Sequence, residues 1–112
     1  MSYHRTITVT CEAFNITVQE FHGRCRRGRI VIARDVFVYI CQAEKYQPKL
    51  FSELGKLSGG RDRTSAYNSY VKIRDQLNQR YDGKYIRDYV AEIKSQCNEI
   101  YDFAETIQSN IL

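Results

Sequence analysis

Apolar positions along the chain recur mainly at helical spacing. Residues 30–45 are apolar almost all round and contain neither glycine nor proline. This stretch is longer than an ordinary strand of about five or six residues, so it predicts a central helix that is buried on every side. Pro48 interrupts the pattern, and residues 50–57 then carry a second helical stripe.

The N-terminal part is more ambiguous. Residues 6–14 are rich in β-branched side chains and have the propensity of a strand, but we expect a short helix that ends near Asn15. Thr17 and Glu20 have the spacing of a capping box. This spacing predicts a helix of one or two turns that ends before Gly23.

A glycine turn follows the helix over residues 50–57. Residues 58–60 are Ser-Gly-Gly, and either Asp62 or Thr64 is a suitable cap for the helix that begins after them. We expect that helix to run to about Arg80. Its inner stripe consists of Ala66, Tyr70, Ile73 and Leu77.

The last part of the chain has a heptad pattern. Over residues 84–111 the apolar positions are spaced alternately by four and three residues, which predicts one long amphipathic helix. Such a seam requires an apolar partner. The partner is either the chain's own globular part or the same helix of a second copy, which would make a homodimer. The seam consists of Ile86, Val90, Ile93, Cys97, Ile100, Ala104, Ile107 and Ile111.

These patterns predict an all-α protein, with one domain over residues 1–81 and the heptad helix over residues 82–112. A composition of 43% hydrophobic and 27% charged residues is that of a chain that folds. No apolar run approaches the roughly 20 residues of a membrane span, and the first residues lack the apolar core of a signal peptide. We therefore expect a cytoplasmic protein. The four cysteines form no CxxC pair, so we expect free thiols and no metal or other cofactor.

Positive charge is concentrated in one part of the chain. Residues 1–81 hold 14 Lys and Arg against 7 Asp and Glu, whereas residues 82–112 hold 3 against 6. The densest stretch, between Glu20 and Asp35, contains two glycines and no acid, and its arginines are Arg24, Arg26, Arg27, Arg29 and Arg34. Such a loop is either a solvated turn or a contact to phosphates or to a minor groove. The asymmetry of charge favours the contact.

A second polar cluster lies at the start of the helix after the glycine turn. Two helices joined by a short glycine turn are typical of a helix-turn-helix, although any helical hairpin has the same pattern. The first turn of a recognition helix meets base edges, and its N–H groups favour phosphate. The residues in this position are Arg61, Asp62, Arg63, Thr64, Ser65 and Asn68.

Both clusters lie within a longer resemblance. The segment GGRDRTSAYNSYVKI, residues 59–73, is similar to a Gly-Gly-Arg-Asp-His-Thr-Thr segment in the C-terminal DNA-binding domain of the bacterial replication initiator DnaA. Glu53-Leu54-Gly55 stands where that family has Glu-Ile-Gly, and the likeness covers roughly residues 7–77 in order. It implies a DnaA C-terminal-domain-like, Trp-repressor-like helix-turn-helix bundle, followed here by the long C-terminal helix.

The resemblance also implies roles for individual residues. In the family, an arginine of the basic loop enters the minor groove while the recognition helix occupies the major groove of an AT-rich box. That arginine corresponds to Arg27, with Arg29 beside it, and the base-reading run corresponds to residues 62–65. Asp62 has two possible roles, a base contact or an N-cap that touches no base. The expected DNA contacts are Arg24, Arg26, Arg27, Arg29, Arg34, Lys49, Arg61, Asp62, Arg63, Thr64, Ser65, Asn68 and Lys72.

Three positions depart from the family's pattern. Arg63 replaces a histidine, and Ser65 replaces a threonine and lacks its methyl group. Asp35 follows Arg34 where the family has basic or polar phosphate contacts. We therefore expect a preferred sequence that differs from the standard initiator box, or weaker specificity.

The sequence predicts specific binding of double-stranded DNA by a regulator of transcription or replication that lies with the nucleoid. It contains no G-x-x-x-x-G-K-[ST] motif, so we expect no nucleotide-driven motor, and no nucleophile pattern, so we expect no enzyme. A free-standing domain of this kind suggests a regulator from a phage or mobile element. The alternative is a protein-interaction module that has kept the scaffold, lost base reading and binds a partner through its last helix.

Overall fold

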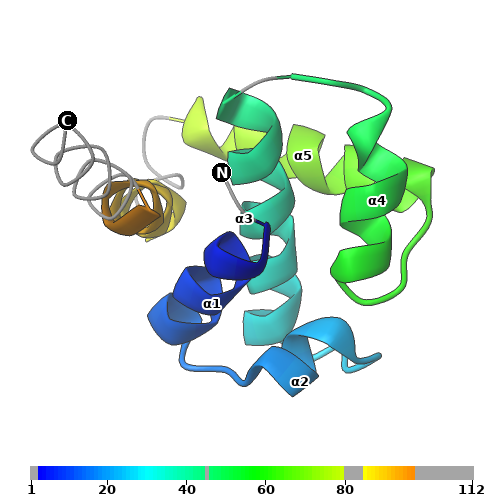
Figure 1. Ribbon diagram of the computed structural model, residues 1–112. Coiled ribbons are helices and arrows are strands. Elements are labelled where there is room, and N and C mark those ends of the chain that lie inside the picture. Colours follow the sequence, from blue (N-terminus) through cyan, green and yellow to red (C-terminus); the bar gives the residue numbers. More distant parts are fainter. Residues whose placement is uncertain (1–2, 45, 80–84, 98–112) are drawn as a thin grey trace, which may run out of the picture.

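Helix α3, Gly28–Glu44, is the element around which the others are arranged. The computed structural model describes residues 3–44, 46–79 and 85–97. Helix α3 contacts each of the other labelled helices (Figure 1), which are α1 (Tyr3–Phe14), α2 (Val18–His22), α4 (Leu50–Leu57) and α5 (Arg63–Leu77). Residues 85–97 are helical as well. The described residues contain no strand, and the predicted all-α fold is confirmed.

The burial of α3 explains its central position. Val36, Phe37 and Val38 follow one another in the sequence, and none of the three has any exposed surface. Three consecutive residues point in directions that differ by about 100°, so α3 is covered on more than one face. The predicted central core helix is confirmed, and it begins at Gly28, two residues before the expected start.

Helix α1 resolves the ambiguity at the N-terminal end. Most of its β-branched residues are buried: Ile7 and Val9 face the core, and the Thr10 hydroxyl donates to Thr6 O at 2.7 Å. Burial of these side chains outweighs their weak helix propensity. The helix ends as predicted near Asn15, which has a φ of 55° and so adopts the left-handed conformation that ends many helices.

The capping box of α2 is confirmed. The Thr17 backbone N–H donates to Glu20 Oε1 at 2.9 Å, and the Glu20 N–H donates to Thr17 Oγ1 at 3.0 Å. The bonds that Thr17 donates to the carboxylate lower the pKa of Glu20. A helix of only five residues is thereby held in a defined orientation. It leads into the loop over residues 23–27, which we call the arginine loop.

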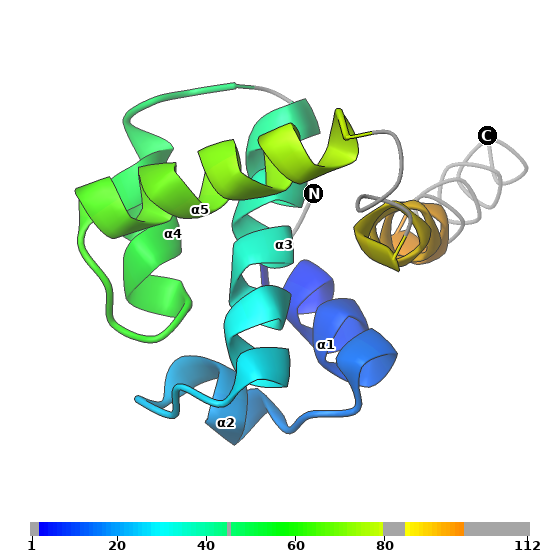
Figure 2. The same cartoon turned by 180° about the vertical axis from the view of Figure 1, so that it is seen from behind.

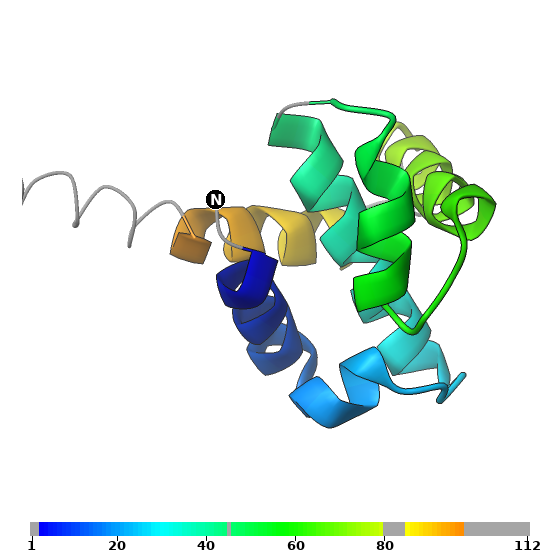
Figure 3. The same cartoon turned by 45° about the vertical axis from the view of Figure 1, so that its right-hand side comes forward.

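The helix over residues 85–97 packs on the core of its own chain, beside α1 (Figures 1 and 3). Ile86, Val90, Ile93 and Cys97 are buried in one cluster with residues of α1, α3 and α5. The Tyr89 ring stacks on Phe14, with ring centroids 4.1 Å apart. These four heptad positions therefore have an apolar partner within the chain. The other expected seam positions lie outside the described residues: Ile100, Ala104, Ile107 and Ile111.

The described helices give no sign of a membrane span or a metal centre. None of them is long and apolar enough to cross a bilayer. Within the same residues, no three His, Cys, Asp or Glu side chains gather where they would hold an ion.

Candidate nucleic-acid interface

The turn between α4 and α5 depends on glycine. A Cβ atom at Gly55 would lie 2.6 Å from the backbone oxygen of Arg61, closer than any side chain can approach. Gly59 and Gly60 have φ values of 99° and 66°, in the left-handed region. The Arg61 N–H donates to Gly55 O at 2.8 Å and closes the turn. Helix α5 consequently begins at a defined place directly beside the end of α4.

The first turn of α5 is capped by Asp62. Its carboxylate accepts from the Ser65 N–H at 2.8 Å, and its extended backbone is that of an N-cap residue. This bond lowers the pKa of the Asp62 carboxyl. Of the two roles open for Asp62, the structure shows the cap. Arg63, Thr64 and Asn68 are exposed on the first two turns of the helix.

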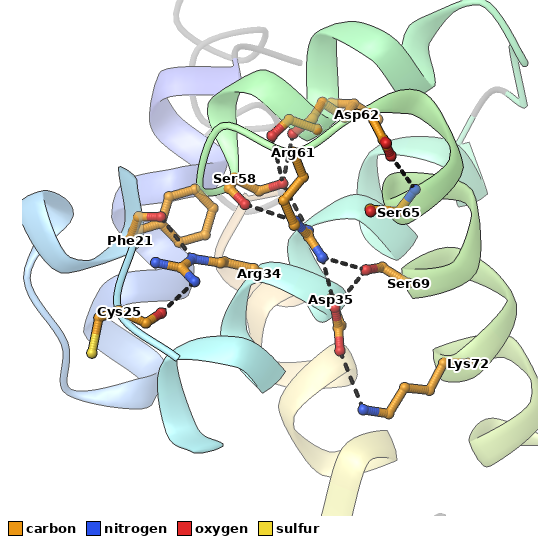
Figure 4. A network of polar contacts seen from close by, with 12 residues as sticks. Phe21, Cys25, Arg34, Asp35, Ser58, Arg61, Asp62, Ser65, Ser69 and Lys72 are labelled. Carbon is orange, nitrogen blue, oxygen red and sulfur yellow. Dashed lines mark hydrogen bonds and ion pairs between the residues drawn. The ribbon is translucent and has the colours of Figure 1, made fainter. Parts of the chain in front are cut away.

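Arg34 organises the arginine loop from inside. Its guanidinium donates to four backbone oxygens. Nε donates to Phe21 at 2.9 Å and Nη1 to Cys25 at 2.6 Å (Figure 4). Nη2 donates to Glu20 at 2.8 Å and to Gly23 at 2.7 Å. A single side chain therefore holds the end of α2 and the first part of the loop. Burial, followed by the nearby charge of Arg61, lowers the pKa of Arg34.

The structure places Arg34, an expected DNA contact, largely inside the fold. The residue is only 5% exposed, and its donors are directed to backbone oxygens of its own chain. Sequence reasoning counted it with the loop arginines because it follows Arg29 by only five positions. Arg34 lies on the inner face of α3, so its guanidinium points toward the end of α2 and the loop.

The loop and the turn are held against each other. A Cβ atom at Gly59 would lie 3.1 Å from Arg34 Cζ and 3.3 Å from Gly23 O, so the turn packs directly on the clamped loop. His22 Nδ1 lies 2.7 Å from Leu57 O and joins the ends of α2 and α4. Both segments lie on the same side of α3 in two opposite views (Figures 1 and 2).

A cleft of about 670 Å³ lies between the loop and the turn. Arg24 and Arg26 line it from the loop, and Ser65 lines it from the first turn of α5. Four of its eight lining residues are arginines, and none is acidic. We call it the arginine cleft; it is lined by Arg24, Arg26, Val31, Arg34, Gly59, Gly60, Arg61 and Ser65.

Arg27 and Arg29 lie elsewhere. They line a separate hollow together with Asn15, Ile16 and Glu20, and both are exposed. The structure thus brings Arg24 and Arg26 to the start of α5, whereas the resemblance had assigned the minor-groove role to Arg27 with Arg29 beside it.

Arg61 and Lys72, both expected DNA contacts, bind a buried carboxylate. Asp35 is 3% exposed; its oxygens lie 3.3 Å from Arg61 Nη1 and 3.5 Å from Lys72 Nζ (Figure 4). Ser69 Oγ donates to Asp35 at 2.5 Å and accepts from Arg61 at 2.7 Å. Arg61 also donates to the backbone oxygen of Ser58 at 2.9 Å. Both cations therefore join α3 to the helix-turn-helix.

Sequence reasoning missed two features of this face, the role of Asp35 and a pair of exposed tyrosines. Asp35 was taken as a departure from a basic surface, yet it is the buried centre of the network just described. Tyr46 and Tyr67, 50% and 44% exposed, lie beside the start of α5. The feature that could have pointed to these tyrosines is a pair of large, partly apolar rings near Arg63. Lys49 is exposed at the N-terminal end of α4 and makes no capping bond with its side chain.

A comparison with known protein families shows to which family this chain belongs. The family described as bacterial dnaA protein helix-turn-helix matches residues 4–73, which include α1 to α4 and most of α5. The chain belongs to this family. The DnaA-like resemblance of the sequence is thereby confirmed.

Several chromosomal replication initiator proteins DnaA are similar to this chain. The protein of Leifsonia xyli is 29% identical over 93 residues, 83% of this chain and 19% of the initiator. That of Streptococcus thermophilus is 35% identical over 66 residues, 59% of this chain and 14% of the initiator. That of Corynebacterium jeikeium is 30% identical over 87 residues, 78% and 14% respectively. The chain thus spans less than a fifth of the length of these DnaA proteins.

Proposed function

We propose that this DnaA-like domain binds double-stranded DNA with α5 in the major groove and the arginine loop in the adjacent minor groove. The observation that carries the proposal is the arginine cleft, which places Arg24 and Arg26 beside the exposed first turn of α5. A helix that enters a major groove brings flanking cationic loops against the neighbouring backbone and minor groove. Arg26 takes the role that the resemblance assigned to Arg27.

The electrostatics of this face support a polyanionic partner. Neutralising phosphates with arginine releases condensed counterions, and narrow AT-rich minor grooves attract guanidinium groups. The N-terminal N–H groups of α5 add their dipole. Arg27, at the end of the loop, and Arg29, in the first turn of α3, line a hollow separate from the arginine cleft, where they are placed to meet phosphates of the flanking backbone.

Base reading would come from a few exposed groups of α5. Arg63 can donate two hydrogen bonds to a guanine, the Thr64 methyl can contact a thymine methyl, and the Asn68 amide can pair with an adenine. Asp62 serves as the cap that orients them. A guanidinium in place of the family's histidine favours a site richer in guanine than the standard initiator box.

The biological role that follows is regulation of transcription or replication in the cytoplasm at the nucleoid, through DNA binding. The relatives named above are replication initiators, and this chain corresponds to a small part of them. A domain that binds DNA in this way can occupy or block a site.

Selection from a random duplex library, followed by fluorescence anisotropy at several salt concentrations, tests the proposal. We expect one enriched sequence and an affinity that falls with salt with a slope of several units. Arg26→Ala and Arg63→Ala should each weaken binding about tenfold or more. Arg74→Ala is the matched control, because Arg74 is exposed near the other end of α5 beside Asp75. Absence of binding at low salt would leave the protein-interaction module as the function.

A further inference from the structure

A second hollow lies on the other side of the start of α5. It measures about 260 Å³ and is lined by Tyr46, Pro48, Phe51, Arg63, Thr64 and Tyr67; we call it the tyrosine groove. Ser65 lines the arginine cleft, whereas Arg63 and Thr64 line this groove. The first turn of α5 therefore stands between the two hollows.

The two tyrosines of the groove are both exposed and held in place. The Tyr67 ring meets Phe51 edge-on, with centroids 5.5 Å apart. The Tyr46 ring contacts both Phe51 and Tyr70, at 5.9 Å and 5.6 Å. Phe51 is only 1% exposed, so the rings rest on a buried support. Tyr46 and Tyr67 are 50% and 44% exposed, and neither hydroxyl forms a hydrogen bond with another described residue, so each is available as a donor.

The widths of a helix and of a major groove indicate which part of the DNA the tyrosine groove would meet. An α-helix with its side chains is about 10–12 Å across, and a major groove is about 12 Å wide, so a helix in the groove fills it. Surfaces that flank the first turn of such a helix meet the two strands that border the groove. Tyr67 lies four residues after Arg63 and three after Thr64, so the three share one exposed face of α5.

We propose that the tyrosine groove seats the sugar–phosphate backbone of one strand of the duplex that α5 enters. The Tyr46 and Tyr67 hydroxyls donate to phosphate oxygens while their rings pack against deoxyribose. This inference rests on the proposed function. Charge supports it, because Arg63 is part of the lining and no lining residue is acidic. Tyrosine hydroxyls are among the usual donors to DNA phosphates.

The test removes the hydroxyls and keeps the rings. Tyr46→Phe, Tyr67→Phe and the double variant are titrated by fluorescence anisotropy on the selected duplex and on a random duplex of the same length. We expect the double variant to bind both duplexes about tenfold more weakly. A hydroxyl displaces no counterion, so the dependence of log K on log salt should keep its slope, whereas Arg27→Ala, at a residue placed to meet phosphates, should lower that slope by about one.

Tyr85→Phe is the matched control. Tyr85 is 55% exposed and begins the helix over residues 85–97, which lies across α3 from α4 (Figures 1 and 2). This variant should bind as the unaltered protein does. Circular dichroism checks that every variant keeps its helical content.

Each other outcome is distinct. If the double variant binds as tightly as the unaltered protein while Arg26→Ala and Arg63→Ala bind less tightly, the groove does not contact the backbone and the proposed function stands. If the loss appears on the selected duplex alone, the tyrosines read bases and the phosphate assignment is wrong. If the unaltered protein binds neither duplex, the proposed function fails and this inference fails with it.

Discussion

The arginine loop and the α4–α5 turn reach the same face of the molecule, but they are held in different ways. The loop has no regular structure between α2 and α3 and depends on one buried guanidinium, that of Arg34. The turn depends on several groups at once: a glycine contact at Gly55, the Asp62 cap, and the network around Asp35. Loss of the one side chain that holds the loop should release the whole loop. Loss of one of the several contacts that hold the turn should weaken the turn only in part.

The electrostatic surroundings of Arg61, in the turn, and of Arg34, which holds the loop, differ as well. Arg61 lies 3.3 Å from the Asp35 carboxylate, so its charge is compensated by an opposite charge. The guanidinium of Arg34 donates to four backbone carbonyls, whose dipoles replace water around a buried cation. Removal of either partner from such an arrangement leaves buried polar groups unsatisfied, which is more costly than the loss of a surface contact.

Replacement of Arg34 by Met should have the largest effect. The methionine side chain fills a similar volume but donates no hydrogen bond, so four backbone oxygens lose their partner. We expect the free energy of unfolding to fall by about 4 kcal/mol in urea titrations. Arg34→Lys, which keeps the charge, should recover only part of it, since one ammonium cannot reach all four oxygens. A free energy of unfolding within 1 kcal/mol of that of the unaltered protein would contradict the conclusion that the loop depends on Arg34.

The same substitution separates the two regions. In Arg34→Lys, amide hydrogen exchange should accelerate over residues 21–27 and stay slow in α4 and α5. Exchange that accelerates equally in the turn would show that the two segments open together, and the comparison above would be wrong.

Gly55→Ala should have the next largest effect. The new Cβ would lie 2.6 Å from Arg61 O and 2.8 Å from Asp62 O, both backbone atoms, so the turn has to shift. We expect a loss of about 3 kcal/mol in the free energy of unfolding, measured in urea. Gly28→Ala is the control: nothing lies within 4 Å of its Cβ position, and alanine should be neutral or stabilise the start of α3 by about 0.5 kcal/mol.

Asp35→Asn should cost less, about 2 kcal/mol, because Lys72 is 53% exposed and regains water. Ser69 and Arg61 keep each other as partners at 2.7 Å. A double-mutant cycle with Ser69→Ala should give a coupling free energy clearly above the error of the urea measurement, because the two side chains are in direct contact. Strict additivity would show that the network does not act as a unit.

Asp62→Ala should have the smallest effect, and it should depend on pH. The folded-state pKa of Asp62 is lowered by the Ser65 N–H, so the cap stabilises the fold above the ordinary carboxyl pKa of about 4. The stabilisation is lost as the pH falls through the lower folded-state value. The difference in melting temperature between the variant and the unaltered protein should thus be present at pH 7 and shrink below about pH 4. An unchanged difference at low pH would mean that the carboxylate is not the cap.

Much of the fold was predictable because helix periodicity and local capping are properties of neighbouring residues. The buried run of α3, the capping box of Thr17 and Glu20, and the glycine turn before α5 were all visible in the sequence. The partner of the heptad seam was left open, because an apolar stripe does not say what covers it. Burial of Ile86 and Ile93 against α1 and α3 supplies that answer for the described part of the helix.

The sequence by itself determined which helices form and that one part of the chain is rich in arginine. Only the tertiary structure decided which arginines face inward and which face the cleft. Arg26 and Arg34 are the same residue type, eight positions apart; Arg34 lies within the apolar run over residues 30–45, but that run does not say which groups its guanidinium meets. The difference arises because Arg34 lies on the inner side of α3, where the carbonyl oxygens of a distant segment converge. A guanidinium turns toward the acceptors that surround it, and those acceptors are placed by the fold.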